Sequence, residues 1–230
     1  MFICVYLCES VSHVNLCVLC ALCGETVMKT IQLAVGGLDS NLSYLIHDEK
    51  SGDAALVDPS GDIRLIKDAV AKLPRAHPRY ILLTHGHHDH CSGVAEARGF
   101  FNAHVAAHPA CPFRHDIDLT DRQQLPFGGI YIECLHAPGH SVDSVVYRLS
   151  DDSAIFTGDT LFIDWCGYCD PHTMFHTMRE ILYPLAGSNE VYPGHDYGRC
   201  PHAALEREKK ENPYLYTTAY DQFCEELKKL

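Results

Sequence analysis

The stretch Thr84-His85-Gly86-His87-His88-Asp89-His90 holds four imidazoles and one carboxylate within seven residues. It follows Tyr80-Ile81-Leu82-Leu83, an apolar run typical of a short strand that is buried on both faces. Imidazole and carboxylate groups are the usual protein ligands of zinc, iron and manganese. So many ligand groups at the end of a strand predict a metal site.

Four further segments carry ligand-type residues at strand ends or turns. His140 and His195 each lie in a Pro-Gly-His turn, and Asp58 and Asp159 each follow an apolar strand. A single turn of this kind is more often only a turn. All of them together, in this order and after strands, favour one shared site.

Spacing divides these residues between two donor sets. His85 and His87 are two apart, so an extended loop directs both the same way, and the chain then turns to present Asp89 and His90. We predict one set of His85, His87 and His140, a second set of Asp89, His90 and His195, and Asp159 as the bridge between them. Two metals about 3.5–4 Å apart would share an acidified hydroxide. Asp58 is predicted to orient a ligand histidine through its distal N–H.

The other histidines are expected to be structural. His88 should face away from its neighbours as a solvated loop residue, and His136 is more typical of a strand end than of a ligand. The remaining ones lack any spacing signal and are expected at the surface or in caps: His104, His108, His115, His172, His176 and His202.

Composition limits the class of protein. A hydrophobic content of 47% can supply a sizeable core, whereas a net charge of −12 with no basic stripe argues against nucleic-acid binding, nucleases included. The apolar run 14–23 is too short to span a membrane, so no membrane partner is expected. Cysteines beyond residue 23 are scattered without a disulfide framework, which indicates a reducing compartment such as the cytoplasm.

Domain organisation is predicted to be simple. Residues 28–230 are patterned as one domain, and residues 1–27 are expected to be a disordered leader or an upstream extension. Cys17-x-x-Cys20-x-x-Cys23, with His13 nearby, could bind a structural metal, but no second ligand pair accompanies it. A metal-buffering or membrane-associated protein without enzymatic activity therefore stays open as an alternative.

The apolar patterns predict the following elements. Strands are expected at 30–35, 42–46, 54–57, 80–83, 105–107, 130–135, 144–149, 154–157 and 190–192. Helices are expected at 62–73, 94–98, 173–182, 203–211 and 221–230, with an irregular loop at 111–127. Each half runs from strands to a helix, which predicts an α+β fold of two packed mixed sheets with helices outside.

These motifs resemble the metallo-β-lactamase superfamily. The resemblance rests on His85-x-His87-x-Asp89-His90 followed by His140, Asp159 and His195 in the family's order, and it covers nearly all of residues 28–230. It implies an αββα sandwich with metals in a cleft along one edge, where the two sheets meet. It also implies that Asp159 bridges both metals in the hydrolases of the family.

Within the superfamily the chain most resembles the small glyoxalase II-like hydrolases and the persulfide dioxygenases. The supporting phrases are 156–162, 192–198 and 208–215. The first resemblance implies a hydrolase of a small thioester, such as a hydroxyacylglutathione, that uses a metal-bound hydroxide and two divalent ions. Zinc is expected, with iron or manganese as alternatives, and Asp89 is expected to hold one metal and orient the nucleophile. The second implies a mononuclear iron dioxygenase that uses His85, His140 and Asp159.

One segment departs from the family pattern. The family usually continues with Gly-Cys-Gly and then Arg or Lys, whose charge helps to hold glutathione, whereas this chain reads Trp165-Cys166-Gly167-Tyr168-Cys169. Tyr168 takes the place of the basic residue, and Tyr197 follows His195 where the family contacts substrate. We therefore predict a small thioester or thiol conjugate as the partner, with Tyr168 and Tyr197 as candidate substrate contacts.

Overall fold

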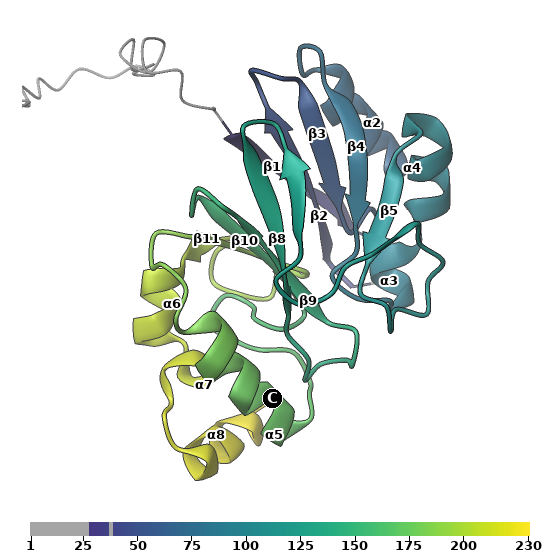
Figure 1. Ribbon diagram of the computed structural model, residues 1–230. Helices are drawn as coiled ribbons and strands as arrows, with labels where there is room; N and C mark the ends of the chain where they lie inside the picture. Colours follow the sequence, from purple (N-terminus) through teal and green to yellow (C-terminus); the bar gives the residue numbers. More distant parts are fainter. Residues whose placement is uncertain (1–27, 37–38) are drawn as a thin grey trace, which may run out of the picture.

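Two sheets packed face to face form the centre of the molecule (Figure 1). The computed structural model describes residues 28–36 and 39–230. The predictions for residues 1–27, including the cysteine motif at 17–23, lie outside these residues. Each sheet has six strands, so the predicted α+β sandwich of two mixed sheets with helices outside is confirmed.

The first sheet follows the order of the chain. Its strands are β1 (Met28–Gly36), β2 (Asn41–Asp48), β3 (Asp53–Val57), β4 (His77–Leu82), β5 (His104–Ala107) and β6 (Ile117–Asp118). The first three strands pair antiparallel, and β3 to β6 run parallel. Parallel neighbours require crossover connections. Helices supply them between β3 and β4 and between β4 and β5, whereas residues 108–116 join β5 to β6 without a helix.

The later strands form the second sheet, and they too are neighbours in the order of the chain. They are β7 (Gln124–Phe127), β8 (Ile130–His136), β9 (Val145–Leu149), β10 (Ala154–Gly158), β11 (Glu190–Pro193) and β12 (Ala203–Ala204). All neighbours pair antiparallel except β10 and β11, which are parallel. Both sheets are therefore mixed.

Helices cover the outer faces of both sheets (Figure 1). On the first sheet lie α2 (Ile63–Ala71), α3 (His88–Cys91) and α4 (Val94–Phe101). On the second lie α5 (Pro171–His176), the π-helical turn η1 (Thr177–Leu182), α6 (Leu205–Glu211), α7 (Pro213–Tyr216) and α8 (Tyr220–Leu227).

Three apolar clusters fill the spaces between the layers. The cluster between the sheets includes the fully buried rings of Phe127, Tyr147 and Phe156. A second cluster packs α2 and α4 on the first sheet, and a third packs α5 and the later helices on the second. Burial of these side chains away from water is the main force that holds the layers together.

The structure corrects the predicted elements in three places. Residues 111–127 are not a continuous loop, because they contain β6 and β7. Pro126 concealed β7, yet a proline is tolerated there because β7 is an edge strand. Residues 203–204 form β12 instead of helix, and α5 gives way to a π-helical turn at Thr177.

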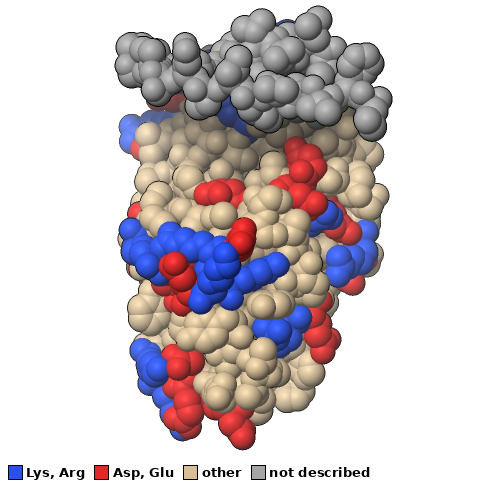
Figure 2. Space-filling model, turned by 90° about the vertical axis from the view of Figure 1, so that its left-hand side faces the viewer, with Lys and Arg blue, Asp and Glu red and all other residues tan. Residues whose placement is uncertain are grey.

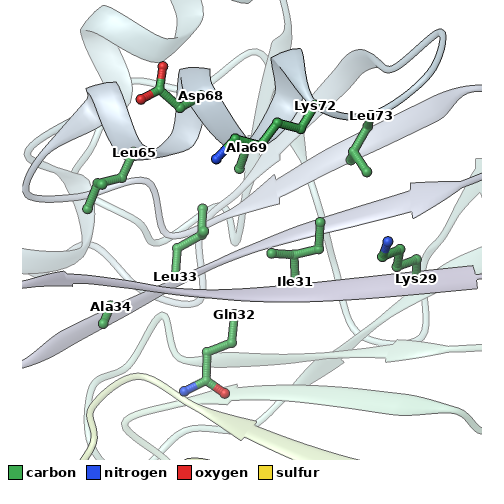
Figure 3. A pocket seen from close by; sticks show the side chains of 10 residues that line it. All are labelled: Lys29, Ile31, Gln32, Leu33, Ala34, Leu65, Asp68, Ala69, Lys72 and Leu73. Atoms are coloured by element: carbon green, nitrogen blue, oxygen red, sulfur yellow. The ribbon is translucent and has the colours of Figure 1, made fainter. Parts of the chain in front are cut away.

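The strand alternation of β1 is visible beside α2 (Figure 3). Ile31 and Leu33 point toward the helix, and Gln32 points the opposite way. Leu65 of α2 is 43% exposed and lines a groove of about 530 Å³ between the helix and β1. The hydrophobic face of α2 is instead formed by Ile63, Ile66, Ala69 and Val70.

Charged side chains of opposite sign lie close together on the surface. Figure 2 shows a face on which Lys and Arg side chains lie beside Asp and Glu side chains. Such pairs include Arg207 with Glu211 and Lys210 with Glu206 on α6. Within residues 28–36 and 39–230, every helix is too short or too polar to cross a bilayer.

Candidate metal centre

The predicted ligand residues come together where the two sheets meet. The first sheet contributes the segment after β4, which runs from His85 into α3. The second contributes Asp159 after β10, His195 after β11, and His140 from the turn after β8. Ends of strands from both sheets thus converge on one place.

Three overlapping groups of side chains there have ligand atoms within 4.8 Å of one another. They are His85, His87 and His140; His85, His90 and Asp159; and Asp89, His90 and His195. The first and third groups are the two donor sets read from the spacing. Asp159 joins them, because its Oδ1 lies 3.2 Å from His90 Nε2 and its Oδ2 lies 3.6 Å from His140 Nε2.

The His140 ring is fixed by a backbone contact. Its Nδ1 lies 2.8 Å from the carbonyl oxygen of Tyr168, and Nδ1 must donate because that oxygen can only accept. In a neutral ring, Nε2 is then a lone pair, and it faces Nδ1 of His87 at 3.0 Å. Nε2 of His85 is buried beside them with no hydrogen-bond partner. Burial, and next the nearby His90, hold the pKa of His85 well below its usual value, which favours the neutral form.

The second donor set has the same construction. Nδ1 of His195 lies 2.6 Å from the carbonyl oxygen of Asp39, and Nδ1 of His90 lies 3.0 Å from Oδ2 of Asp58. The two Nε2 atoms face one another at 3.2 Å, and Oδ2 of Asp89 is 3.4 Å from each. Burial opposes a charge on His90, but the nearby carboxylates of Asp159 and Asp58 outweigh burial and raise the pKa of His90.

A cation satisfies this arrangement better than hydrogen bonds do. Lone pairs that face one another at about 3 Å repel unless positive charge lies between them. Oδ1 of Asp159 is close to two imidazoles and still makes no hydrogen bond of acceptable geometry. One proton could relieve one such contact, but several occur in a single buried cluster. The donor set therefore fits one or more divalent metal ions, since imidazole and carboxylate are their ordinary ligands.

Asp58 is tightly held beneath the second set. Its Oδ1 accepts from the Thr84 backbone N–H at 2.8 Å, and its Oδ2 accepts from the Thr84 hydroxyl at 2.6 Å. Ser43 donates to its carbonyl oxygen at 2.6 Å. The backbone of Asp58 is left-handed, with φ of 45°, which is costly for a residue with a side chain. Asp58 is therefore in place to fix the ring of His90, and this role stays a prediction.

Close backbone approach is required at Gly194. A Cβ atom there would lie 2.4 Å from Oδ1 of Asp159 and 2.7 Å from Cε1 of His90. No side chain fits at such distances, so glycine lets the β11 turn pass directly against the centre.

Comparison with known proteins agrees with this geometry. A sequence profile described as the Metallo-beta-lactamase superfamily matches residues 36–217. The chain belongs to this superfamily. A metallo-beta-lactamase structure from Staphylococcus aureus subsp. aureus COL shares its fold with a TM-score of 0.75, covering 88% of this chain and 67% of that chain at 23% identity.

Relatives in the superfamily differ in the reactions that their names state. A hydroxyacylglutathione hydrolase of Anaeromyxobacter dehalogenans is 40% identical over 68% of this chain, which spans only 62% of that relative. A probable polyketide biosynthesis zinc-dependent hydrolase of Bacillus subtilis is 31% identical over 80% of this chain and 85% of its own. A mitochondrial persulfide dioxygenase of Homo sapiens is 31% identical over 82% of this chain and 74% of its own. The chain is thus a metal-dependent enzyme of the superfamily, with hydrolases and a dioxygenase among its relatives.

The other residues considered in the sequence lie around the candidate metal centre or outside it. The exposed His88 belongs to none of the three groups. His136 binds the Val142 carbonyl at 3.0 Å and stacks on His108. The Tyr168 side chain is 87% exposed, and Tyr197 is 43% exposed with its ring stacked on His195.

Sequence reasoning missed two supports of the second donor set. Asn41 Nδ2 donates to Oδ2 of Asp89 at 3.0 Å, and the Asp39 carbonyl receives His195. Asn41 begins β2 and Asp39 lies in the turn before it, next to Leu42, whose N–H donates to the Gly194 carbonyl at 2.9 Å. No local pattern signals contacts between segments so far apart in the chain.

Proposed function

We propose that this chain is a metal-dependent hydrolase of small thioesters. The observation that carries the proposal is the pair of adjacent donor sets, in which the Nδ1 atoms of His140, His90 and His195 are all engaged by oxygen acceptors. Their Nε2 atoms are then free to bind metal. Two donor sets that share Asp159 are the arrangement expected of hydrolases with two metals.

The residues that would hold the metals follow from the groups described above. His85, His87 and His140 would hold one ion, Asp89, His90 and His195 a second, and Asp159 would lie between them. Bound divalent ions supply a water of lowered pKa and a Lewis acid for the carbonyl oxygen. Zinc is proposed, with iron or manganese as alternatives.

Asp89 is the proposed catalytic residue. Burial raises its pKa, but the hydrogen bond from Asn41 and the nearby His90 outweigh burial and lower it, so the carboxylate is ionised at neutral pH. An ionised carboxylate at this position can orient a water proton for attack on the carbonyl carbon. The departing thiolate needs little acid catalysis, because thiols have a pKa of about 8.5.

Hydrolase relatives support this proposal, and a second candidate is persulfide oxidation. The names of the Anaeromyxobacter and Bacillus relatives state hydrolysis. The second candidate rests on His85, His140 and Asp159, which form the two-His one-carboxylate set that suits non-haem iron. The human relative is named for that reaction.

Metal analysis beside two assays tests both candidates. We expect purified protein to hold two divalent ions per chain and to hydrolyse acyl thioesters of N-acetylcysteamine. One iron per chain, with oxygen uptake on a persulfide and no thioester hydrolysis, would overturn the proposal in favour of the dioxygenase. Asp159→Ala should remove metal and abolish turnover, and the exposed His88→Ala should change neither. Equal losses in both variants would refute the ligand assignment.

A further inference from the structure

A pocket of about 360 Å³ opens beside the second donor set. It is lined by Phe162, Trp165, Cys166, Tyr168, Tyr197 and Leu230. The ring of Tyr197 lies parallel to the ring of His195, with centroids 4.9 Å apart, and Phe162 meets His195 edge-on at 5.8 Å. A group held in this pocket would therefore be near the candidate metal centre, in contact with the rings of Tyr197 and Phe162 that pack on His195.

The walls of this pocket expose an unusual amount of aromatic surface. The side chains of Trp165, Tyr168 and Tyr197 are 40%, 87% and 43% exposed. Large apolar side chains gathered at a cleft commonly mark a place where a ligand binds. Aromatic rings favour other rings, which they meet by offset stacking or edge to face.

The surroundings of the pocket are unsuited to a carboxylate. None of its lining residues is Lys or Arg, and the same holds for the adjoining pocket, which shares Tyr168 and includes His140. Arg199 is close in sequence to Tyr197, but it is paired with Asp164 and Glu211. The Tyr197 hydroxyl donates to the Asp39 carboxylate. A negatively charged ligand would thus meet Asp39 and no unpaired cation among these residues.

The loop 162–165, which carries Phe162 and Trp165, is anchored by the side chains of Glu208 and Asn212. Oε2 of Glu208 accepts from the Asp164 N–H at 2.8 Å, and Nδ2 of Asn212 donates to the carbonyls of Phe162 and Trp165 at 3.2 and 3.1 Å. Glu208 and Asn212 are both fully buried. The backbone that carries Phe162 and Trp165 is therefore fixed before a ligand binds, which reduces the conformational entropy lost on binding.

We infer that this pocket binds an uncharged aromatic group of the substrate and that the chain discriminates against thiols that carry carboxylates, such as glutathione. The inference rests on the proposed function only in taking the substrate to be a thioester. The aromatic group could belong to the acyl part or to the thiol part, and the two are separated by placing a phenyl ring on either side of the thioester.

Binding can be measured without turnover, because Trp165 is the single tryptophan of the chain. We expect S-benzyl-N-acetylcysteamine, a thioether that cannot be hydrolysed, to change the fluorescence of Trp165 with a Kd about tenfold below that of the S-methyl compound. S-benzylglutathione, which carries carboxylates, should bind more weakly than the benzyl cysteamine. Equal affinity for the methyl and benzyl compounds, or tighter binding of the glutathione conjugate, would overturn the inference.

Two variants and a matched control locate the effect. Tyr197→Ala should lose about the same tenfold preference for the benzyl compound, and Tyr168→Arg should strengthen binding of S-benzylglutathione about tenfold. Tyr131→Ala removes a tyrosine that is 37% exposed on β8 and should leave both affinities unchanged. A loss in Tyr131→Ala equal to that in Tyr197→Ala would contradict the assignment of the pocket.

Turnover separates this inference from the proposed function. Faster hydrolysis of phenylacetyl than of acetyl N-acetylcysteamine would assign the ring to the acyl part, and a preference for the acetyl thioester of benzyl mercaptan would assign it to the thiol part. Ring-dependent fluorescence without any thioester hydrolysis would refute the proposed function and support the pocket. Thioester hydrolysis without any preference for a ring, in turnover or in binding, would support the proposed function and refute the assignment of the pocket.

Discussion

Each proposed ligand histidine of the second donor set is oriented by the atom that its Nδ1 contacts. For His195 that atom is a backbone oxygen, which no single side-chain substitution removes. For His90 it is Oδ2 of Asp58, which a substitution can change. Asp58 is therefore the residue at which the orientation of a ligand can be tested without altering the ligand itself.

The variant Asp58→Asn should bind metal about 10–100-fold more weakly than the native protein. The carboxylate of Asp58 accepts three hydrogen bonds, two from Thr84 and one from His90, and an amide must turn its NH₂ group toward one of these donors. Competition with a chelator measures the loss. Asp68→Asn, on the exposed side of α2, is the matched control. Undiminished affinity in a folded Asp58→Asn protein would show that Asp58 does not fix His90.

Residue types at this scale were predictable, and their supports were not. The imidazoles and carboxylates stand out because few other roles gather them at strand ends. Asn41 and Asp39 could not be found, because one acts through an ordinary amide and the other through its backbone carbonyl. Contacts of that kind depend on how β2 meets the turn after β11 and leave no mark on local sequence.

At the scale of elements, α6 and α7 anchor a neighbouring loop, a role that their sequence pattern does not indicate. A helix was predicted at 203–211, and the structure shows that Glu208 and Asn212 also hold the loop 162–165. Asn212 also caps α7, since its Oδ1 accepts from the Tyr214 N–H at 3.0 Å. One side chain thus begins a helix and anchors the loop 162–165, which lines the proposed substrate pocket.

Replacement of Asn212 by alanine should lower the free energy of unfolding by about 3 kcal/mol. The loss combines a helix cap with two carbonyl oxygens, at Phe162 and Trp165, that lose a buried donor. Urea unfolding followed by circular dichroism, with metal content held equal, measures it. Lys210→Ala, exposed on α6, should stay within about 0.5 kcal/mol of the native protein. If the two variants were equally stable, the loop would not depend on Asn212.

Elements were easiest to predict where apolar periodicity was strong and hardest at the edges of sheets. β2, β8 and β10 are largely buried and were found within a few residues of their bounds. β7 and β12 are edge strands whose pairing, not composition, makes them strands. The π-helical turn of η1 is likewise set by packing against the second sheet, since Met178 and Leu182 are fully buried.

At the scale of the whole molecule, the order of the layers was predictable from the strands and helices in each half of the chain. The hydrogen bonds between the two halves, here called ties, were not predictable. One such tie is Asp53 of β3, whose Oδ2 accepts from the Gly128 N–H at 3.0 Å across 75 residues of sequence. Gly128 lies in the turn between β7 and β8, so the contact joins the two sheets. Arg79 and His77 also bind this carboxylate, at 2.9 and 2.8 Å.

Asp53→Asn should therefore destabilise the protein in a manner that depends on pH. Burial raises the pKa of Asp53, but the hydrogen bonds from Gly128, Arg79 and His77 outweigh burial and lower it. A lowered folded-state pKa adds stability above the unfolded value of about 3.9, and this stability is lost as pH falls through the folded value. We expect a loss of about 1–3 kcal/mol at pH 7 that shrinks as the pH is taken below about 4. Urea unfolding across this pH range measures the difference in free energy of unfolding between the native protein and Asp53→Asn, with Asp221→Asn on α8 as control. A difference that stays constant with pH would show that the charge of Asp53 does not join the sheets.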